Sequence, residues 1–393
     1  MAEVVIVDAV RTPIGKRNGS LSTVHPADLL GVALKGLISR SQIDPVLVEQ
    51  VVGGCVSQVG EQSFNITRTA WLSAGLPQST AATTVDTQCG SSQQATNFAT
   101  ALISAGVVDV AVACGVESMS RIPIGSNSSK KLSLGVPIPK SYFSQVEFTS
   151  QFEGAERIAD KWGVTRSDCD EFGFNSQKRA AVAWSEGRFE TQIIPVDAPI
   201  RDSDGNPTSE SSVFRTDEGL RETTIEKLST LKPVARENGV HTAGTSSQIS
   251  DGAAAVLIMS ADKAAALGLK PIARIVDTCL VGVDPVLMLT GPIDATRRLL
   301  DRTGLSIDNI DLFEINEAFA SVVLAWSREL NADLDRTNPN GGAIALGHPL
   351  GATGAFLLTK AIHELQRTDT NTALVSMCCG GGLGTGTIIE RLN

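Results

Sequence analysis

Val85-Asp86-Thr87-Gln88-Cys89-Gly90-Ser91-Ser92-Gln93-Gln94-Ala95 is the stretch on which the interpretation of this chain depends. The small and β-branched residues 81–85 predict a strand, and apolar side chains at helical spacing predict a helix over residues 93–105. Cys89 falls in the turn between them, where Gly90 supplies backbone freedom. A thiol at the start of a helix meets the positive end of the peptide dipole, which favours the thiolate. The alternative is a small packed cysteine beside a turn, so other residues must discriminate between the two interpretations.

Composition and charge limit the class of protein. The chain is 42% hydrophobic and 4% aromatic with 36 glycines, which suits an α/β protein with parallel strands and close packing of helices on a sheet. At 393 residues it is long enough for two or more core-bearing units. The net charge of −10 argues against nucleic acid as a partner, because no basic stripe is available to neutralise phosphates. A local basic pocket for a phosphorylated cofactor is compatible with that charge.

The cysteines and the ends of the chain bear on its compartment. Seven cysteines without framework spacing indicate free thiols in a reducing compartment. Residues 1–8 hold an acidic residue and a short strand pattern, unlike a signal peptide, and no run of about 18 apolar residues predicts a membrane span. The last residues, Glu390-Arg391-Leu392-Asn393, carry no peroxisomal signal. We therefore expect a cytoplasmic protein.

Two parts of the chain repeat the same order of elements. A strand, a turn with Cys89, a helix and a strand come first; a strand, a turn with His348, a helix and a strand ending at Cys378 follow later. The match in order and turn chemistry predicts a duplicated α/β unit. If the two halves pack about a pseudo-twofold axis, the turns converge and Asn316, which also follows a predicted strand, joins the same cavity.

The predicted domain organisation has two halves and one insertion. Residues 121–139 are rich in Pro, Ser, Asn and Lys, and residues 195–212 form a polar tract with Pro and Gly. Long insertions of this kind commonly carry binding contacts. The expected boundaries are an N-terminal half at 1–118 and 251–270, an inserted loop domain at 119–250, and a C-terminal half at 271–393.

His348 and Cys378 supply the chemical groups that Cys89 needs. His348 lies in a segment too rich in glycine for a packed strand, and beside a cysteine at a helix start it completes a nucleophile–base pair. Cys378 ends a buried strand, and the glycine loop predicted from Gly380 to Gly386 has amides that can stabilise an oxyanion. No metal-ligand spacing predicts zinc. A dinucleotide loop is excluded because the 7 residues after Gly386 leave no room for the required helix and second strand.

Four segments resemble the active-site loops of the thiolases, and the resemblance runs over residues 4–391. Within that family the chain most resembles the degradative 3-ketoacyl-CoA thiolases, especially the actinobacterial branch that shortens the side chains of steroid-CoA esters. The four loops are Cys89-Gly90-Ser91, Asn316-Glu317-Ala318-Phe319, Gly347-His348-Pro349 and Cys378-Cys379-Gly380. The narrower match is carried by Gly60-Glu61-Gln62-Ser63, Gln151-Phe152-Glu153 and residues 245–250.

The resemblance implies a thiolase-like fold, in which two duplicated α/β halves form a layered αβαβα arrangement with a long inserted loop domain. It also implies acetyl-CoA C-acyltransferase activity in β-oxidation of fatty acid or steroid side chains. His348 would activate Cys89, whose thiolate attacks the 3-keto carbon and retains the acyl group. Cys378 would protonate the departing acetyl-CoA carbanion and later deprotonate CoA. A water held by Asn316 would form one oxyanion hole with His348, and the amides of Cys89 and Gly380 the other.

Coenzyme A is implied as a substrate held by the inserted domain, with no tightly bound cofactor and no metal. Arg221 and Thr223 are expected at its nucleotide end, Ser247 along its pantetheine arm, and Gln151 in the pocket. The family likeness also implies a homodimer or homotetramer.

The sequence departs from the acetoacetyl-CoA thiolase pattern at two places. No His-Met-Gly precedes Ala155-Glu156-Arg157, and Ala235 stands where many relatives have Phe. Both changes are compatible with a bulkier acyl group. The alternatives are an acetoacetyl-CoA thiolase working in the condensing direction, a β-ketoacyl synthase-type condensing enzyme, and a non-catalytic acyl-CoA carrier. The second cysteine disfavours the synthase, since that family has histidine there, and the presence of all four loop residues disfavours the carrier.

Overall fold

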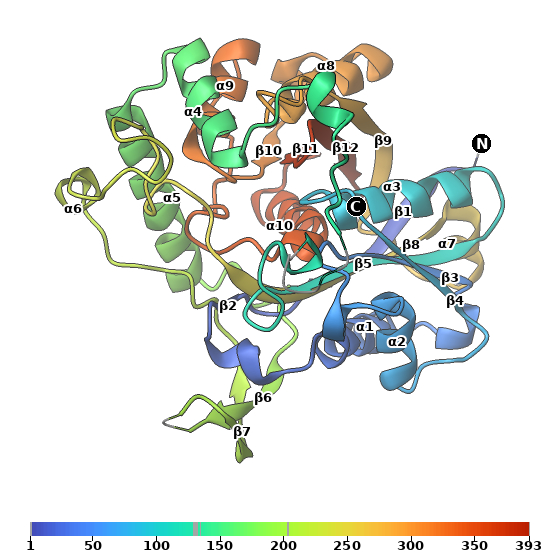
Figure 1. The fold of residues 1–393 in the computed structure, drawn as a ribbon. Coiled ribbons are helices and arrows are strands. Elements are labelled where there is room, and N and C mark those ends of the chain that lie inside the picture. The colour runs from blue at the N-terminus through green and yellow to red at the C-terminus, as the bar shows by residue number, and fades with distance from the viewer. Residues whose placement is uncertain (1, 129–132, 134, 203, 393) are drawn as a thin grey trace.

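The strands of the two predicted halves lie in one mixed sheet. Figure 1 shows the computed structural model, which describes residues 2–128, 133, 135–202 and 204–392. The spatial order of the strands is β10-β11-β12-β9-β1-β8-β5-β3-β4, with the short β2 paired to β8. The strands are β1 (Val4–Arg11), β2 (Gly15–Lys16), β3 (Gln50–Gly54), β4 (Ala81–Val85), β5 (Val110–Ser118), β8 (Ser250–Ser260), β9 (Ala273–Gly282), β10 (Leu312–Ile315), β11 (Thr372–Cys379) and β12 (Leu383–Arg391).

The two halves of the sheet are built in the same way. In the first half β3 runs parallel to β5, β5 antiparallel to β8, and β8 antiparallel to β1. In the second half β10 runs parallel to β11, β11 antiparallel to β12, and β12 antiparallel to β9. A short antiparallel pairing, Val5 with Arg274 and Ile6 with Ala273, joins the halves. The duplicated α/β arrangement predicted from the sequence is confirmed.

Helices cover the sheet in three layers. The helices of the two halves are α1 (Pro26–Ser41), α2 (Ile66–Ser73), α3 (Ser91–Ser104), α7 (Ala261–Ala266), α8 (Gly291–Thr303), α9 (Ala320–Leu330) and α10 (Thr353–Thr368). Figure 1 shows α10 at the centre of the molecule, with α1 and α2 on one side and α8 and α9 on the other. Residues of α3 and α10 share one core with both halves of the sheet. Separate cores lie under α1 with α2, and under α8 with α9.

The end of the chain differs from the expected glycine loop. Only residues 380–382 form a turn, because β12 begins at Leu383 and pairs with both β11 and β9. Gly384 lies inside this strand, where an added Cβ would come within 2.4 Å of the Gly291 carbonyl oxygen. That glycine therefore serves close packing of a strand on a helix rather than a flexible loop.

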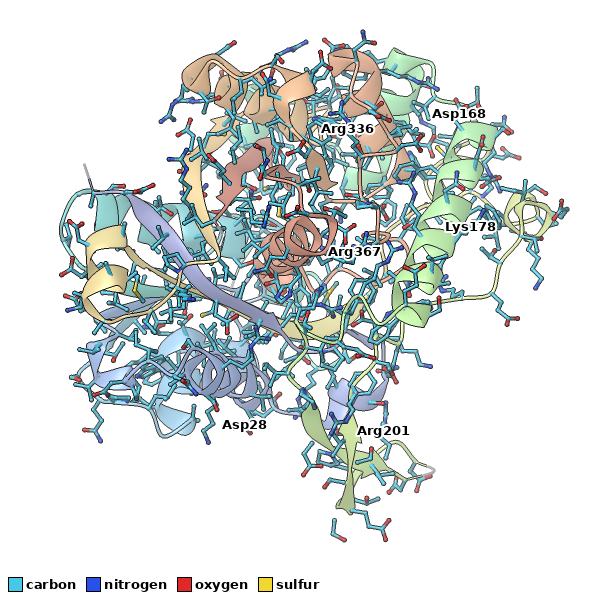
Figure 2. All side chains as sticks on the ribbon, turned by 180° about the vertical axis from the view of Figure 1, so that it is seen from behind. Asp28, Asp168, Lys178, Arg201, Arg336 and Arg367 are labelled. Atoms are coloured by element: carbon cyan, nitrogen blue, oxygen red, sulfur yellow. The ribbon has the colours of Figure 1, made fainter. Side chains whose placement is uncertain are left out.

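The insertion contains its own small elements. They are α4 (Gln151–Trp162), α5 (Arg166–Ser185), β6 (Val196–Arg201), β7 (Pro207–Phe214) and α6 (Ile225–Ser229). β6 and β7 form an antiparallel hairpin within the tract predicted to be merely polar, and Figure 2 labels Arg201 on it. The parts of the polar stretches at 129–132, 134 and 203 lie outside the described residues. None of the described helices is long and apolar enough to cross a bilayer.

Candidate active site

A strained turn presents Cys89 at the end of β4. Gln88, the residue before it, has a φ of 51°, a left-handed conformation that costs free energy for a residue other than glycine. Two side chains stabilise the turn: Asp86 Oδ1 accepts from the Gln88 amide at 2.7 Å, and Ser91 Oγ accepts from the Thr87 amide at 3.0 Å. Cys89 as a whole residue is half-buried, whereas the neighbouring Gly90 is buried.

The electrostatics of Cys89 differ from the expected thiolate. Burial raises the pKa of its thiol to about 12, against the lowering effect of the backbone amides of Gly380 and of Cys89 itself. The carboxylates of Glu117 and Asp86 raise that pKa further. The start of α3 therefore does not ionise the thiol by itself, and a nucleophilic role for Cys89 would require a base to remove its proton.

Cys378 lies next to this thiol at the end of β11. Burial raises its pKa well above the ordinary value, and the neighbouring Cys89 and Cys379 sulfurs raise it further. The Cys379 sulfur packs against Gly90, where an added Cβ would lie 2.5 Å from it. Cys378 is thus a buried, protonated thiol beside Cys89, which is the state that a proton donor requires.

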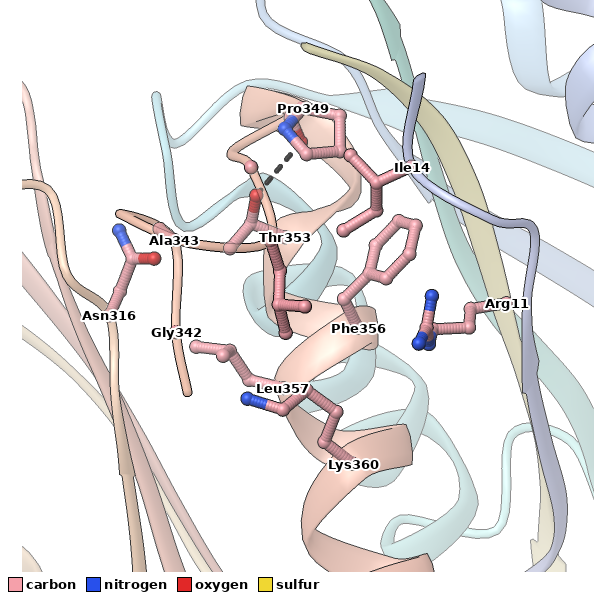
Figure 3. Close-up of a pocket in the computed structure, with 12 residues that line it drawn as sticks. Arg11, Ile14, Asn316, Gly342, Ala343, Pro349, Thr353, Phe356, Leu357 and Lys360 are labelled. Carbon is pink, nitrogen blue, oxygen red and sulfur yellow. Dashed lines mark hydrogen bonds between the residues drawn. The ribbon is translucent and has the colours of Figure 1, made fainter. Parts of the chain in front are cut away.

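His348 is held in one tautomer by its neighbours. Its Nδ1 lies 2.6 Å from Thr353 Oγ1, and the Thr353 hydroxyl donates to the Pro349 carbonyl oxygen at 2.9 Å, a bond drawn in Figure 3. Because that hydroxyl proton is already used, Oγ1 accepts from Nδ1–H, and Nε2 carries the lone pair. The His348 amide donates to Ser250 Oγ at 3.0 Å, which fixes the backbone at the same point.

The free nitrogen of His348 faces Asn316. Asn316 Nδ2 donates to His348 Nε2 at 3.3 Å, and burial lowers the pKa of this histidine to about 4. His348 is therefore a neutral base at physiological pH. Figure 3 shows Asn316 beside a small pocket lined by Gly342, Ala343 and the first turn of α10, and its Oδ1 has no hydrogen-bond partner within the described part of the chain.

The first turns of α3 and α10 bring the two halves of the site together. The Ala355 amide donates to Ser92 Oγ at 2.9 Å, and at Gly354 an added Cβ would lie 2.3 Å from the Gln93 nitrogen. The buried carboxylate of Glu117 connects the same region. It accepts hydrogen bonds from the amides of Val56, Ser57 and Gly351 and from the side chain of Gln62.

Three supporting residues were not identified from the sequence. Thr353 lies in the glycine-rich stretch around His348. The sequence shows its distance along the chain from the histidine, but not that its hydroxyl contacts the ring. Ser250 and Glu117 lie far from His348 in sequence and on β8 and β5, and only the pairing of these strands places them beside the catalytic turns. Ser250 ends a segment that carries the family resemblance, but neither residue gave a signal of its contact in the site.

The residues predicted to bind CoA lie on three different segments of the chain. Arg221 and Thr223 line a pocket with Gln177 and Lys178 of α5, and Figure 2 labels Lys178 on that helix. The Ser247 amide donates to the Ala318 carbonyl oxygen at 3.0 Å, which places Ser247 against the turn that follows Asn316. Gln151 is the first residue of α4, which begins after the N-cap Ser150.

The chain was then compared with known proteins. It matches the families described as "Thiolase, N-terminal domain" at residues 4–262 and "Thiolase, C-terminal domain" at residues 269–391. It is 48% identical to the steroid 3-ketoacyl-CoA thiolase FadA6 of Mycobacterium tuberculosis over 100% of this chain and 95% of that protein.

Solved structures give the same result for the fold. The crystal structure of the Bacillus anthracis acetyl-CoA acetyltransferase superposes with a TM-score of 0.91 at 37% identity, covering 100% of this chain and 99% of that one. Human mitochondrial 3-ketoacyl-CoA thiolase superposes with a TM-score of 0.89 at 34% identity, with the same coverage. The fold predicted from the sequence is confirmed.

Proposed function

The chain belongs to the thiolase family and is an acyltransferase, and from that premise we propose that it cleaves 3-ketoacyl-CoA with CoA to acetyl-CoA and a shortened acyl-CoA. The proposed acyl carrier is Cys89. One observation supports this assignment above the others: the backbone amides of Gly380 and of Cys89 itself both act on the Cys89 thiol and lower its pKa, so both amides lie close to the sulfur. Two converging amides at a nucleophile are the arrangement that stabilises the oxyanion of a thioester reaction.

In the first half of the reaction His348 Nε2 takes the proton of the Cys89 thiol, and the sulfur attacks the 3-keto carbon. The bond between the α and β carbons then breaks, and its electron pair leaves with the acetyl-CoA portion. Cys378 donates its proton to that carbanion, so the acyl group stays on Cys89 and acetyl-CoA departs. The high pKa of Cys378 keeps this thiol protonated until the carbanion forms.

In the second half a CoA molecule enters and loses its thiol proton to the Cys378 thiolate. The CoA sulfur attacks the acyl carbonyl carbon, the bond to Cys89 breaks, and the proton held by His348 returns to Cys89. The amides of Cys89 and Gly380 stabilise one oxyanion, and Asn316 with His348 stabilises the other through the water that the family resemblance implies. Arg221, Thr223 and Ser247 would hold CoA, as the resemblance implies.

An apolar acyl chain is the substrate class that fits best. Cys378 is packed in a buried apolar cluster with Ala155, Leu289, Ala318 and Phe319, so the surroundings of its thiol are apolar. The 48% identity to a relative named as a steroid 3-ketoacyl-CoA thiolase supports a bulky acyl group in particular. Degradation of fatty acid or steroid side chains is the corresponding process.

The substrate proposal is tested by a panel of thiolysis reactions. We expect kcat/KM for a medium-chain or a steroid-side-chain 3-ketoacyl-CoA to exceed that for acetoacetyl-CoA, because the relative named as a steroid 3-ketoacyl-CoA thiolase is 48% identical to this chain and a longer apolar chain offers more surface for binding. A clear preference for acetoacetyl-CoA would contradict the proposal and favour the alternative, an acetyl-CoA acetyltransferase. Absence of thiolysis with every member would contradict the proposed function.

The role of Cys378 has its own test. Cys378→Ser should still accept an acyl group on Cys89 from an acyl-CoA, whose thiolate can leave without a proton, but fail to complete turnover with a 3-ketoacyl-CoA, because a hydroxyl is too weak an acid to replace the thiol. A near-normal turnover rate would remove the proton-transfer role. Cytoplasmic localisation and a homodimer or homotetramer are further predictions, to be checked by cell fractionation and by light scattering of the purified protein.

A further inference from the structure

Ile344 belongs to two parts of the molecule at once. It lies four residues before His348 in the same turn, and it also lines a second pocket that, like the one beside Lys178, contains Arg221 and Thr223. The floor of the proposed CoA pocket and the catalytic turn are therefore one piece of backbone. How that backbone is held bears on how CoA and the base are spaced.

The side-chain amide of Gln248 holds this backbone from one side. Its Nε2 donates to the Ile344 carbonyl oxygen at 2.8 Å and to the Gly219 carbonyl oxygen at 2.8 Å, with Ala345 as a third acceptor at 3.2 Å. An NH₂ group has two protons, so the two shorter contacts account for both. Gln248 thus connects the turn that contains Ile344 and His348 to the segment that runs from Gly219 to Arg221.

Gln177 of α5 holds the same two segments from the other side. Its Nε2 donates to the Ile344 carbonyl oxygen at 3.2 Å, and its Oε1 accepts from the Arg221 amide at 2.9 Å. The two lone pairs of the Ile344 carbonyl are then occupied by the two glutamines. Gln177 is buried, so water does not easily replace these bonds.

The backbone amide of Ile344 is hydrogen-bonded to the turn that carries Asn316. Its amide donates to Glu317 Oε2 at 3.1 Å, and Glu317 is the residue after Asn316. The chain at Gly219 also lies directly on this backbone, since an added Cβ there would be 2.5 Å from the Ala345 carbonyl oxygen. Ile344 therefore sits between the segment of Arg221 and the turns that carry Asn316 and His348.

From these contacts we propose that Gln248 and Gln177 are positioning residues that hold the CoA-binding segment Gly219–Thr223 and the catalytic turn at Ile344 in one fixed spacing. The proposal rests on the proposed function, because it assigns CoA to the pocket of Arg221 and Thr223. Neither glutamine touches the reacting atoms. They allow binding energy from the nucleotide end of CoA to place its thiol against the acyl group and His348, since remote binding energy raises a rate only through a rigid connection.

The proposal is tested by comparing CoA with pantetheine, a thiol acceptor that lacks the nucleotide. The quantity of interest is the CoA advantage, defined as kcat/KM for CoA divided by kcat/KM for pantetheine. Gln248→Met keeps the length of the side chain but cannot donate, and we expect it to lower the CoA advantage about tenfold, the effect of losing two neutral hydrogen bonds. A merely structural role would lower both rates equally and leave the ratio unchanged.

A second variant and a matched control complete the design. Gln177→Met should lower the CoA advantage in the same direction, and it replaces Gln248→Met if that variant does not fold. In the double variant the two effects should combine to less than their product, because both glutamines bond the Ile344 carbonyl. Gln78→Met, on an exposed glutamine before β4, should leave the ratio as in the unmodified protein.

The outcomes separate this inference from the proposed function. If the unmodified protein thiolyses no 3-ketoacyl-CoA with either acceptor, the proposed function fails. If the unmodified protein is active and both glutamine variants keep its CoA advantage, the positioning role is overturned while the proposed function stands. A reduced CoA advantage in either variant, with Gln78→Met unchanged, supports the inference.

Discussion

Replacing Thr353 by valine should remove the group that fixes the tautomer of His348. Thr353 Oγ1 lies 2.6 Å from His348 Nδ1, and the valine variant keeps the shape of the side chain but offers no acceptor. The tautomer with Nδ1–H then has an unpaired buried donor, whereas the tautomer with Nε2–H can no longer accept the proton of Cys89. The variant should therefore hold the base largely in its inactive form.

The size of the effect follows from the burial of this ring. His348 is 3% exposed, so its unpaired N–H finds no water in place of Thr353. Leaving a buried donor unpaired costs about 1–3 kcal/mol. If that whole cost acts against the active tautomer, kcat falls about 5- to 150-fold. The loss of the bond to the Pro349 carbonyl adds a stability cost of about 1 kcal/mol, which a small fall in Tm would show.

The assay is steady-state thiolysis with saturating CoA, with Thr353→Ser as the matched control. The serine variant keeps the hydroxyl at the same position and should retain kcat within about threefold of the unmodified protein, a difference of under 1 kcal/mol. KM should change little in both variants, because the tautomer acts on proton transfer rather than on binding. The reasoning is refuted if Thr353→Val keeps its kcat, or if Thr353→Ser is damaged as severely.

Three further predictions concern stability and packing. Burial lowers the pKa of His363 to about 4, so its contribution to stability is present above the unfolded pKa of about 6.5 and is lost as pH falls. Between pH 7 and pH 4 the unfolding free energy of His363→Gln should therefore fall by about 3 kcal/mol less than that of the unmodified protein, as measured by denaturant unfolding at each pH. Asp217→Ala should destabilise the fold by about 3–5 kcal/mol in denaturant unfolding, because it leaves the buried guanidinium of Arg11 unpaired after removing contacts of 2.8 and 3.0 Å. An unchanged midpoint would contradict this. Gly90→Ala should abolish turnover while the protein stays folded by circular dichroism, because its Cβ would displace the Cys379 sulfur at 2.5 Å; a normal rate would show that the turn has more room.

The catalytic turns were predictable from sequence because each follows a strand and begins a helix. Cys89 and His348 stand at corresponding points of the two repeats, and the repeat order alone indicated that they converge. The structure confirms the duplicated fold, and α3 and α10 begin side by side as that order requires. The roles assigned to these residues stay predictions.

Other features depend on contacts between distant parts of the chain, which no local pattern contains. The protonation of Cys89 is decided by burial rather than by its position before α3, so the thiolate expected from the helix start was wrong for the resting state. The glycines after Cys379 were interpreted as one loop, although Gly384 lies in a strand whose close neighbour, Gly291, is remote in sequence. Gln248 gave no chemical signal in the sequence, since its partners are all backbone carbonyls.

The central claim is that Cys89 carries the acyl group. The protein is mixed with a 3-ketoacyl-CoA in the absence of free CoA, quenched in acid, digested and analysed by mass spectrometry. The account predicts the mass of the shortened acyl group on the peptide that contains Cys89, its release on addition of CoA, and no adduct in Cys89→Ala. An acyl group found on Cys378 instead, or thiolysis retained in Cys89→Ala, would contradict it.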